Sequence, residues 1–103
     1  MMALAHKFAE KYWKPILRHL LLKQPLRMEN ERDRPLLEYV IDEVKSLYKQ
    51  TPSGYECRIC GRKHFTSRGL YFHLTRKHAD VIIYLIEDLV INYMKLDELW
   101  WKQ

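Results

Sequence analysis

The feature that most constrains this chain is a group of four potential metal ligands between residues 57 and 78. Cys57 and Cys60 are separated by two residues, Cys60 and His73 by twelve, and His73 and His78 by four. Two cysteines at such a spacing can present both thiolates from one tight turn, and two histidines about one helical turn apart lie on one face of a helix. Because a chain of 103 residues buries only a modest fraction of its surface, a metal held by these side chains would stabilise the fold.

The motif resembles the C2H2-type zinc finger, and the resemblance covers residues 55–78, about a quarter of the chain. Leu70 stands where that family has its buried leucine, and Tyr55 where it has the aromatic residue of the first strand. Gly61 suits the positive φ of a turn that follows two cysteine ligands. The resemblance implies a ββα unit with one structural Zn²⁺, bound by Cys57, Cys60, His73 and His78.

One position departs from the family pattern. His64 stands where the family has a core aromatic residue, and Phe65 follows one place later. Three arrangements are therefore open: Phe65 fills the core through a shifted turn, His64 packs there as a flat ring, or His64 replaces a histidine ligand. The last would leave His73 and His78 without a shared partner.

An apolar stripe near the start of the chain predicts a first helix from Ala3 to about Lys23. Pro15 falls inside this pattern and removes a backbone donor, which predicts a kink there or two shorter helices. The large apolar residues of the stripe recur every four positions and are Leu4, Phe8, Tyr12, Ile16 and Leu20.

A second helix is predicted after a connecting loop at residues 24–34. Asp33 is placed to act as the N-cap with Pro35 in the first turn, and the apolar pattern continues to about Gln50. The TPSG sequence at residues 51–54 then ends the helix and marks the boundary with the motif.

The apolar pattern after His78 contains neither Gly nor Pro and predicts a third helix that runs to the end of the chain. We expect a break near Ala79, since one helix from Ser67 to Trp101 would be roughly 50 Å long. The expected fold is a single, mainly α domain with one small β-hairpin: an N-terminal two-helix region at 1–52, the zinc finger at 53–78 and a C-terminal helix at 79–103. That last helix packs on the first two, or forms a homodimer contact through Tyr93, Leu96, Trp100 and Trp101.

Composition excludes several classes of protein. Hydrophobic residues make up 48% of the chain, with three Gly and four Pro, which is typical of a packed globular protein. No apolar run reaches about 18 residues and no signal peptide is recognisable, so we expect an intracellular protein without membrane contact. A reducing interior favours metal thiolates over a disulfide. Four protein ligands would leave no position for an activated water, so we expect neither an enzyme nor a small-molecule substrate.

The net charge of +5 is unevenly distributed along the chain. Residues 1–23 and 53–78 carry +4 and +5, whereas residues 24–52 and 79–103 carry −1 and −3. A polyanion would meet the two basic segments, although such residues can also simply keep a small surface solvated. The expected phosphate contacts are Arg58, Arg62, Lys63, Arg68, Arg76 and Lys77.

The positions that read bases in DNA-binding members of the family are held here by Thr66, Gly69 and Phe72, with Arg68 in an auxiliary place. These residues discriminate bases weakly, since Gly69 has no side chain and Phe72 can only touch a thymine methyl or stack on an unpaired base. A single finger covers about 3 base pairs, so sequence specificity would need a dimer or a second element.

The leading hypothesis is nucleic-acid binding, to DNA in preference to RNA, by a small transcriptional regulator. Two alternatives stay open: a protein-interaction adaptor with a purely structural zinc finger, and a binder of structured RNA. A single finger between helices resembles the small zinc-finger proteins of archaea and archaeal viruses. Asn and Gln number only five together, a composition that leans towards a thermophile.

Overall fold

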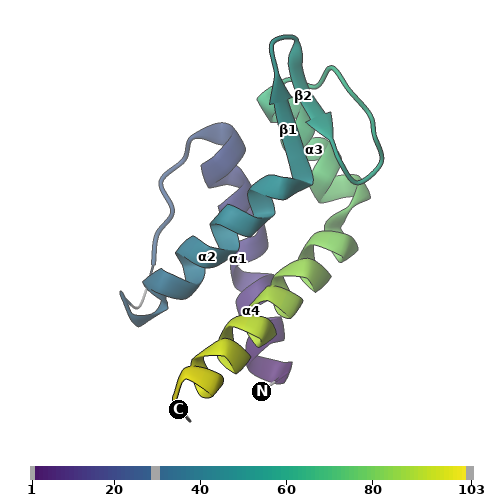
Figure 1. The fold of residues 1–103 in the computed structure, drawn as a ribbon. Coiled ribbons are helices and arrows are strands. Elements are labelled where there is room, and N and C mark those ends of the chain that lie inside the picture. Colours follow the sequence, from purple (N-terminus) through teal and green to yellow (C-terminus); the bar gives the residue numbers. More distant parts are fainter. Residues whose placement is uncertain (1, 29–30, 102–103) are drawn as a thin grey trace.

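The computed structural model describes residues 2–28 and 31–101, and within them the side chains of residues 4–28 and 31–95. The described chain forms α1 (Met2–Leu22), α2 (Arg34–Val44), β1 (Tyr48–Thr51), β2 (Gly54–Cys57), α3 (Ser67–Lys77) and α4 (Ala79–Trp101). Two short 3-10 turns, Glu31–Asp33 and Lys45–Leu47, flank α2. The predicted fold class is confirmed: a mainly helical single domain with one antiparallel hairpin in its described part (Figure 1).

Helix α1 runs unbroken through Pro15, so the expectation of two shorter helices is wrong. Its buried face also differs from the predicted stripe, because Ala5 and Ala9 are fully buried whereas Leu4 is 61% exposed. A spacing of four residues advances about 40° round a helix of 3.6 residues per turn, so a strict four-residue stripe drifts off any flat contact face.

The second helix ends earlier than the sequence predicts. Helix α2 stops at Val44, and Tyr48–Thr51 forms β1 instead of the last helical turn. Asp33 does occupy the N-cap position, with Pro35 in the first turn, but its side chain makes no capping hydrogen bond. Strand pairing outweighs the helical pattern here, because residues 48–51 find a complete backbone partner in residues 54–57.

The hairpin therefore lies earlier in the sequence than the finger motif predicts. TPSG forms its turn rather than a boundary, and the register pairs Tyr48 with Cys57 and Gln50 with Tyr55. Opposed residues in an antiparallel pair share a face, so these four side chains lie on one side of the hairpin. Towards the motif, only an isolated bridge joins Tyr55 to Phe65.

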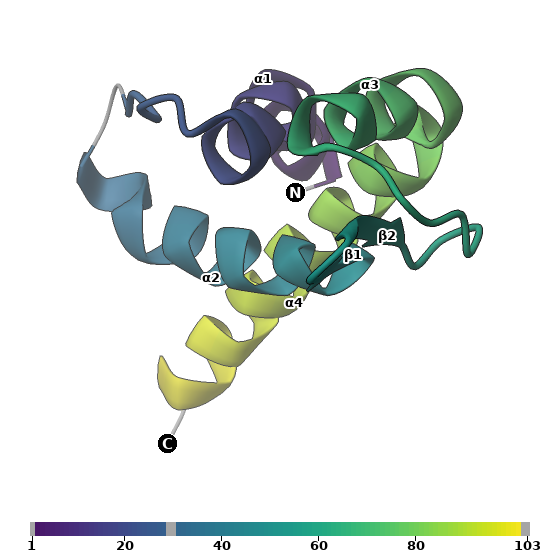
Figure 2. The same cartoon turned by 90° about the horizontal axis from the view of Figure 1, so that it is seen from above.

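Helices α3 and α4 are separate, with the break at His78 close to the predicted position. Helix α4 packs against α1 and α2, and α3 packs against α1 (Figure 2). Tyr93 belongs to these internal contacts, since its ring lies 5.5 Å from that of Tyr39. The side chains of Leu96, Trp100 and Trp101 lie outside the described residues, so the dimer contact stays a prediction. Fully buried core residues come from every helix and include Ile16, Leu17, Val40, Val44, Leu70, Leu74, Ile82 and Ile86.

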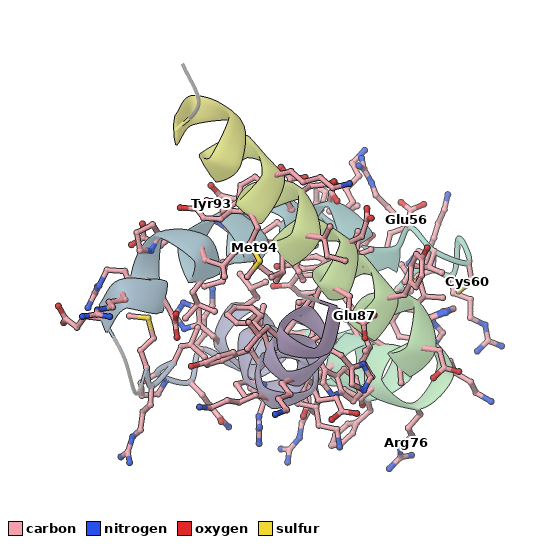
Figure 3. All side chains as sticks on the ribbon, turned by 90° about the horizontal axis from the view of Figure 1, so that it is seen from below. Glu56, Cys60, Arg76, Glu87, Tyr93 and Met94 are labelled. Carbon is pink, nitrogen blue, oxygen red and sulfur yellow. The ribbon has the colours of Figure 1, made fainter. Side chains whose placement is uncertain are left out.

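An ionic contact joins α1 to α4. His6 Nδ1 hydrogen-bonds the carboxylate of Glu87 on α4, and His6 Nε2 lies 2.8 Å from Glu10 Oε1 on its own helix. Glu87 lies where the two helices meet (Figure 3). The hydrogen bond to Glu87 and the charge of Glu10 raise the pKa of His6 above its usual value of 6.5.

We expect this contact to make stability depend on pH. Because the pKa of His6 is raised in the folded state, its contribution is complete below about pH 6.5 and is lost as pH rises through the folded-state value. Thermal unfolding of the protein and of His6→Gln, followed at pH 5.5 and pH 8, should show a larger difference in Tm at the lower pH. Glu87→Gln should remove most of that pH dependence; a difference in Tm that is the same at both pH values would contradict the assignment.

Candidate metal centre

Four side chains, from the hairpin, the turn after it, α3 and the residue that directly follows α3, converge on one point. They are Cys57, Cys60, His73 and His78, and their ligand atoms all lie within 4.8 Å of one another. His73 Nε2 is 3.3 Å from Cys60 Sγ and 3.2 Å from His78 Nε2. Around a tetrahedral zinc ion, ligand atoms would be separated by about 3.3 Å between nitrogens and by about 3.6 Å between nitrogen and sulfur. The group is thus positioned to hold one metal ion.

The cysteine pair is held by a hydrogen-bonded turn. The Gly61 amide donates to the Cys57 carbonyl at 2.8 Å, and the Cys57 amide donates to the Arg62 carbonyl at 2.8 Å. Gly61 has a φ of +81°, as the sequence predicts. The Arg58 amide donates to the Leu47 carbonyl at 2.9 Å, which ties the turn to the residues before β1.

Phe65, not His64, fills the place of the core aromatic residue. The Phe65 ring is partly buried and stacks on His73 with 4.6 Å between ring centroids. Its backbone exchanges two hydrogen bonds with Tyr55, of 2.8 and 3.0 Å. His64 is exposed and lies outside the ligand group. It is the extra residue that places Phe65 one position later than in the family pattern, and it adopts a left-handed φ of +68°. Gly54 permits the close approach of this segment, because a Cβ there would lie 2.6 Å from the Phe65 carbonyl oxygen.

Helix α3 orients the histidine ligands. Its N-cap is Thr66, whose hydroxyl oxygen accepts a hydrogen bond of 2.9 Å from the Gly69 amide. Burial lowers the pKa of His73, and the charges of His78, Arg62 and Lys77 lower it further. The ring therefore stays neutral near pH 7 and offers its nitrogen lone pair to a metal.

The pKa of the buried Cys57 thiol changes in the opposite direction from that of His73. Burial raises its pKa, although the backbone amides of Cys60 and Ile59 partly oppose the change. Without a cation the thiol keeps its proton, so metal binding has to displace that proton. Metal affinity should accordingly weaken as pH falls.

The outer face of α3 carries a row of alternating cationic and aromatic groups. The guanidinium carbons of Arg68 and Arg76 lie 6.0 and 5.2 Å from the centroid of the Phe72 ring, which is 39% exposed. Arg76 projects outward from the helix in Figure 3. The structure brings these three predicted residues together on one helix face.

The other predicted nucleic-acid contacts are placed differently. Thr66 is exposed, but its hydroxyl is used as the helix cap. Arg58 lies in the cysteine turn, whereas Lys77 ends α3. Arg62 and Lys63 lie in the loop that leads to the helix, and all four basic side chains are exposed.

Compared with known protein families, curated proteins and solved structures, the chain matches none. Among the described helices, none is long and apolar enough to cross a membrane. The fold and the site define a small helical protein with a Cys2His2 cluster, positioned for one metal ion, beside a two-stranded hairpin. This arrangement is compatible with a zinc finger.

Proposed function

We propose that this chain is a zinc-binding protein that contacts nucleic acid, DNA in preference to RNA, through the outer face of α3. Zinc is the metal because two thiolates and two imidazoles are the donor set of structural zinc sites. All four positions of the tetrahedron are protein ligands, so the metal is structural and the protein has no catalytic role. The two free cysteines have to stay reduced to bind it, which supports an intracellular location.

The observation that carries the proposal is the row formed by Arg68, Phe72 and Arg76. Guanidinium groups pair with phosphates, and an exposed aromatic ring between them can stack on a base or cover a sugar. The neighbouring exposed Arg62, Lys63 and Lys77 extend the positive charge of the finger segment. Regulation of transcription is the role that such a small DNA-binding protein would serve.

The test is a fluorescence-anisotropy titration of the zinc-loaded protein on mixed-sequence duplex DNA over a range of salt concentrations. Affinity should fall steeply as salt rises, and Arg68→Ala or Arg76→Ala should each reduce the slope of log K against log salt by about one unit. Lys95→Ala removes one exposed cation from the acidic α4 segment and should leave that slope unchanged. Absence of binding at low salt, or equal effects of all three substitutions, would overturn the proposal. Tighter binding to a structured RNA would favour the RNA-binding alternative over DNA.

A second candidate, the protein-interaction adaptor, is favoured by two exposed apolar residues on α4. Val81 is 48% and Tyr84 72% exposed, and at a spacing of three they share a helix face. In that case the metal centre would serve only as scaffolding. Loss of a protein partner with Tyr84→Ser, while DNA affinity stays unchanged, would identify this role.

A further inference from the structure

A cavity of about 750 Å³ lies between the carboxyl end of α1 and the hairpin. Its walls include three basic residues, two tyrosines and two glutamines, namely His19, Lys23, Lys45, Tyr48, Tyr55, Gln24 and Gln50. Among the described residues, no Asp or Glu lines it. No residue of α3 takes part, so the cavity is separate from the outer face of that helix. Its volume falls within the range of about 300–1,000 Å³ that is usual for small-molecule sites, and it opens widely to solvent.

The charge of the cavity suits an anion. The carboxyl end of α1 contributes the equivalent of about −0.5 charge, which the ammonium groups of Lys23 and Lys45 outweigh. Lys45 has only an exposed ion pair with Asp42, at 3.5 Å, which a stronger anion can replace. The single acidic residue of the hairpin, Glu56, pairs with Lys49 in the register and so lies on the opposite face of the strands from Gln50 and Tyr55.

His19 is oriented by a hydrogen bond to the backbone. Its Nδ1 lies 2.9 Å from the Gln24 carbonyl oxygen, and because a carbonyl can only accept, Nδ1 carries the proton. Nε2 is then the ring atom that can bind a further group, as acceptor when neutral and as donor when the ring is protonated.

The aromatic part of the cavity suits a planar ring. Tyr48 and Tyr55 have ring centroids 5.8 Å apart and lie on the same face of the hairpin as Gln50. Burial, and then the neighbouring Tyr55, raise the pKa of Tyr48, so its hydroxyl stays a hydrogen-bond donor. The Gln50 amide adds both a donor and an acceptor, which is what the edge of a nucleobase requires.

We propose that this cavity binds a nucleotide unit, with the base against Tyr48 and Tyr55 and the phosphate against Lys23 and Lys45. Any of the bases can stack on aromatic rings, and a phosphate pairs with ammonium groups. The same chemistry is offered by a free mononucleotide and by an unpaired nucleotide within a strand. The site goes beyond the proposed function, because it uses none of the residues on the outer face of α3.

The test is an NMR titration of the zinc-loaded, ¹⁵N-labelled protein with adenosine monophosphate. The amide signals of Lys23, Tyr48 and Gln50 should shift, and affinity should exceed that for adenosine or for inorganic phosphate alone. Lys45→Ala and Lys23→Gly should each weaken binding about tenfold; glycine is chosen because Lys23 has a φ of +58°. Lys49→Ala, on the opposite face of the hairpin from Gln50 and Tyr55, is the matched control and should leave the affinity unchanged.

A short single-stranded oligonucleotide separates the two sources of the nucleotide. If the oligonucleotide binds the same residues more tightly than the mononucleotide does, the natural ligand is an unpaired nucleotide of a nucleic-acid strand. Equal or weaker binding would assign the site to the free nucleotide. Signals that shift only within residues 62–77, or equal affinities for adenosine, phosphate and the nucleotide, would overturn the proposal. Such a result would leave the salt-dependent DNA binding of α3 standing, and loss of that DNA binding would leave this site standing.

Discussion

Removal of the metal should unfold the hairpin and α3, residues 48–78, and weaken the packing of the whole domain. Zinc binding contributes about 10–16 kcal/mol in small finger peptides, which equals or exceeds the usual total stability of about 5–15 kcal/mol for a domain. A metal held by the four residues would also link β2, the turn after it and α3, in addition to the backbone hydrogen bonds that join Tyr55 to Phe65 and Cys57 to Arg62. Far-ultraviolet circular dichroism after chelation should show lost helix, and native mass spectrometry should show one metal per chain beforehand.

Two variants make this prediction specific. Cys60→Ser removes a ligand from the group and should lower metal affinity greatly, whereas His64→Ala changes an exposed histidine outside the group and should bind metal normally. The affinity should also fall as pH is lowered, because protons compete for the thiolates and imidazoles. Unchanged ellipticity after complete chelation, or normal metal binding by Cys60→Ser, would show that the four residues do not form a structural metal site.

Leu74→Ala should destabilise the entire domain by about 2–5 kcal/mol. Leu74 is fully buried on the face of α3 that also carries the buried Leu70 and Tyr71, and this face joins the core shared with α1 and α4. Truncation would leave a cavity that the rigid ends of α3, held at the metal and at the Thr66 cap, cannot close. Urea unfolding of the zinc-loaded protein measures the change directly.

The shape of the unfolding curve carries a second result. If the finger and the helices share one core, Leu74→Ala should shift a single cooperative transition. Val81→Ala, at an exposed position, should change stability by less than about 0.5 kcal/mol. Two separate transitions, with only one of them shifted, would mean that the finger is an independent unit.

The Cys2His2 cluster was predictable because its spacing reflects local covalent geometry. Cys57 and Cys60 lie in one turn, His73 lies in the last part of α3 and His78 directly follows that helix. No distant part of the chain is needed to recognise either pair. Gly61 was predictable for the same reason, since the turn itself requires its positive φ. The break between α3 and α4 followed from length alone.

The start of the hairpin was not predictable from local pattern. Leu47 and Tyr48 continue the apolar period of α2, yet Tyr48–Thr51 forms a strand because residues 54–57 supply backbone partners across the TPSG turn. Tyr48 and Thr51 belong to residue types that are enriched in strands, and the pairing partner outweighs the helical period of α2. The cavity was not predicted for the same reason, because Tyr48 and Gln50 line it as residues of β1 and not of a helix.

What the sequence by itself determined is thus the Cys2His2 cluster, the mainly helical class and the uneven distribution of charge, each of which depends on spacing along the chain or on composition. The tertiary structure alone decided that Ala5 and Ala9, not Leu4, face the core. It alone decided that Phe65, not His64, packs on His73. It also decided that Lys23 and Lys45 line one cavity together with two tyrosines. The reason is that these outcomes depend on contacts between residues far apart in the chain, whose partners no local pattern specifies.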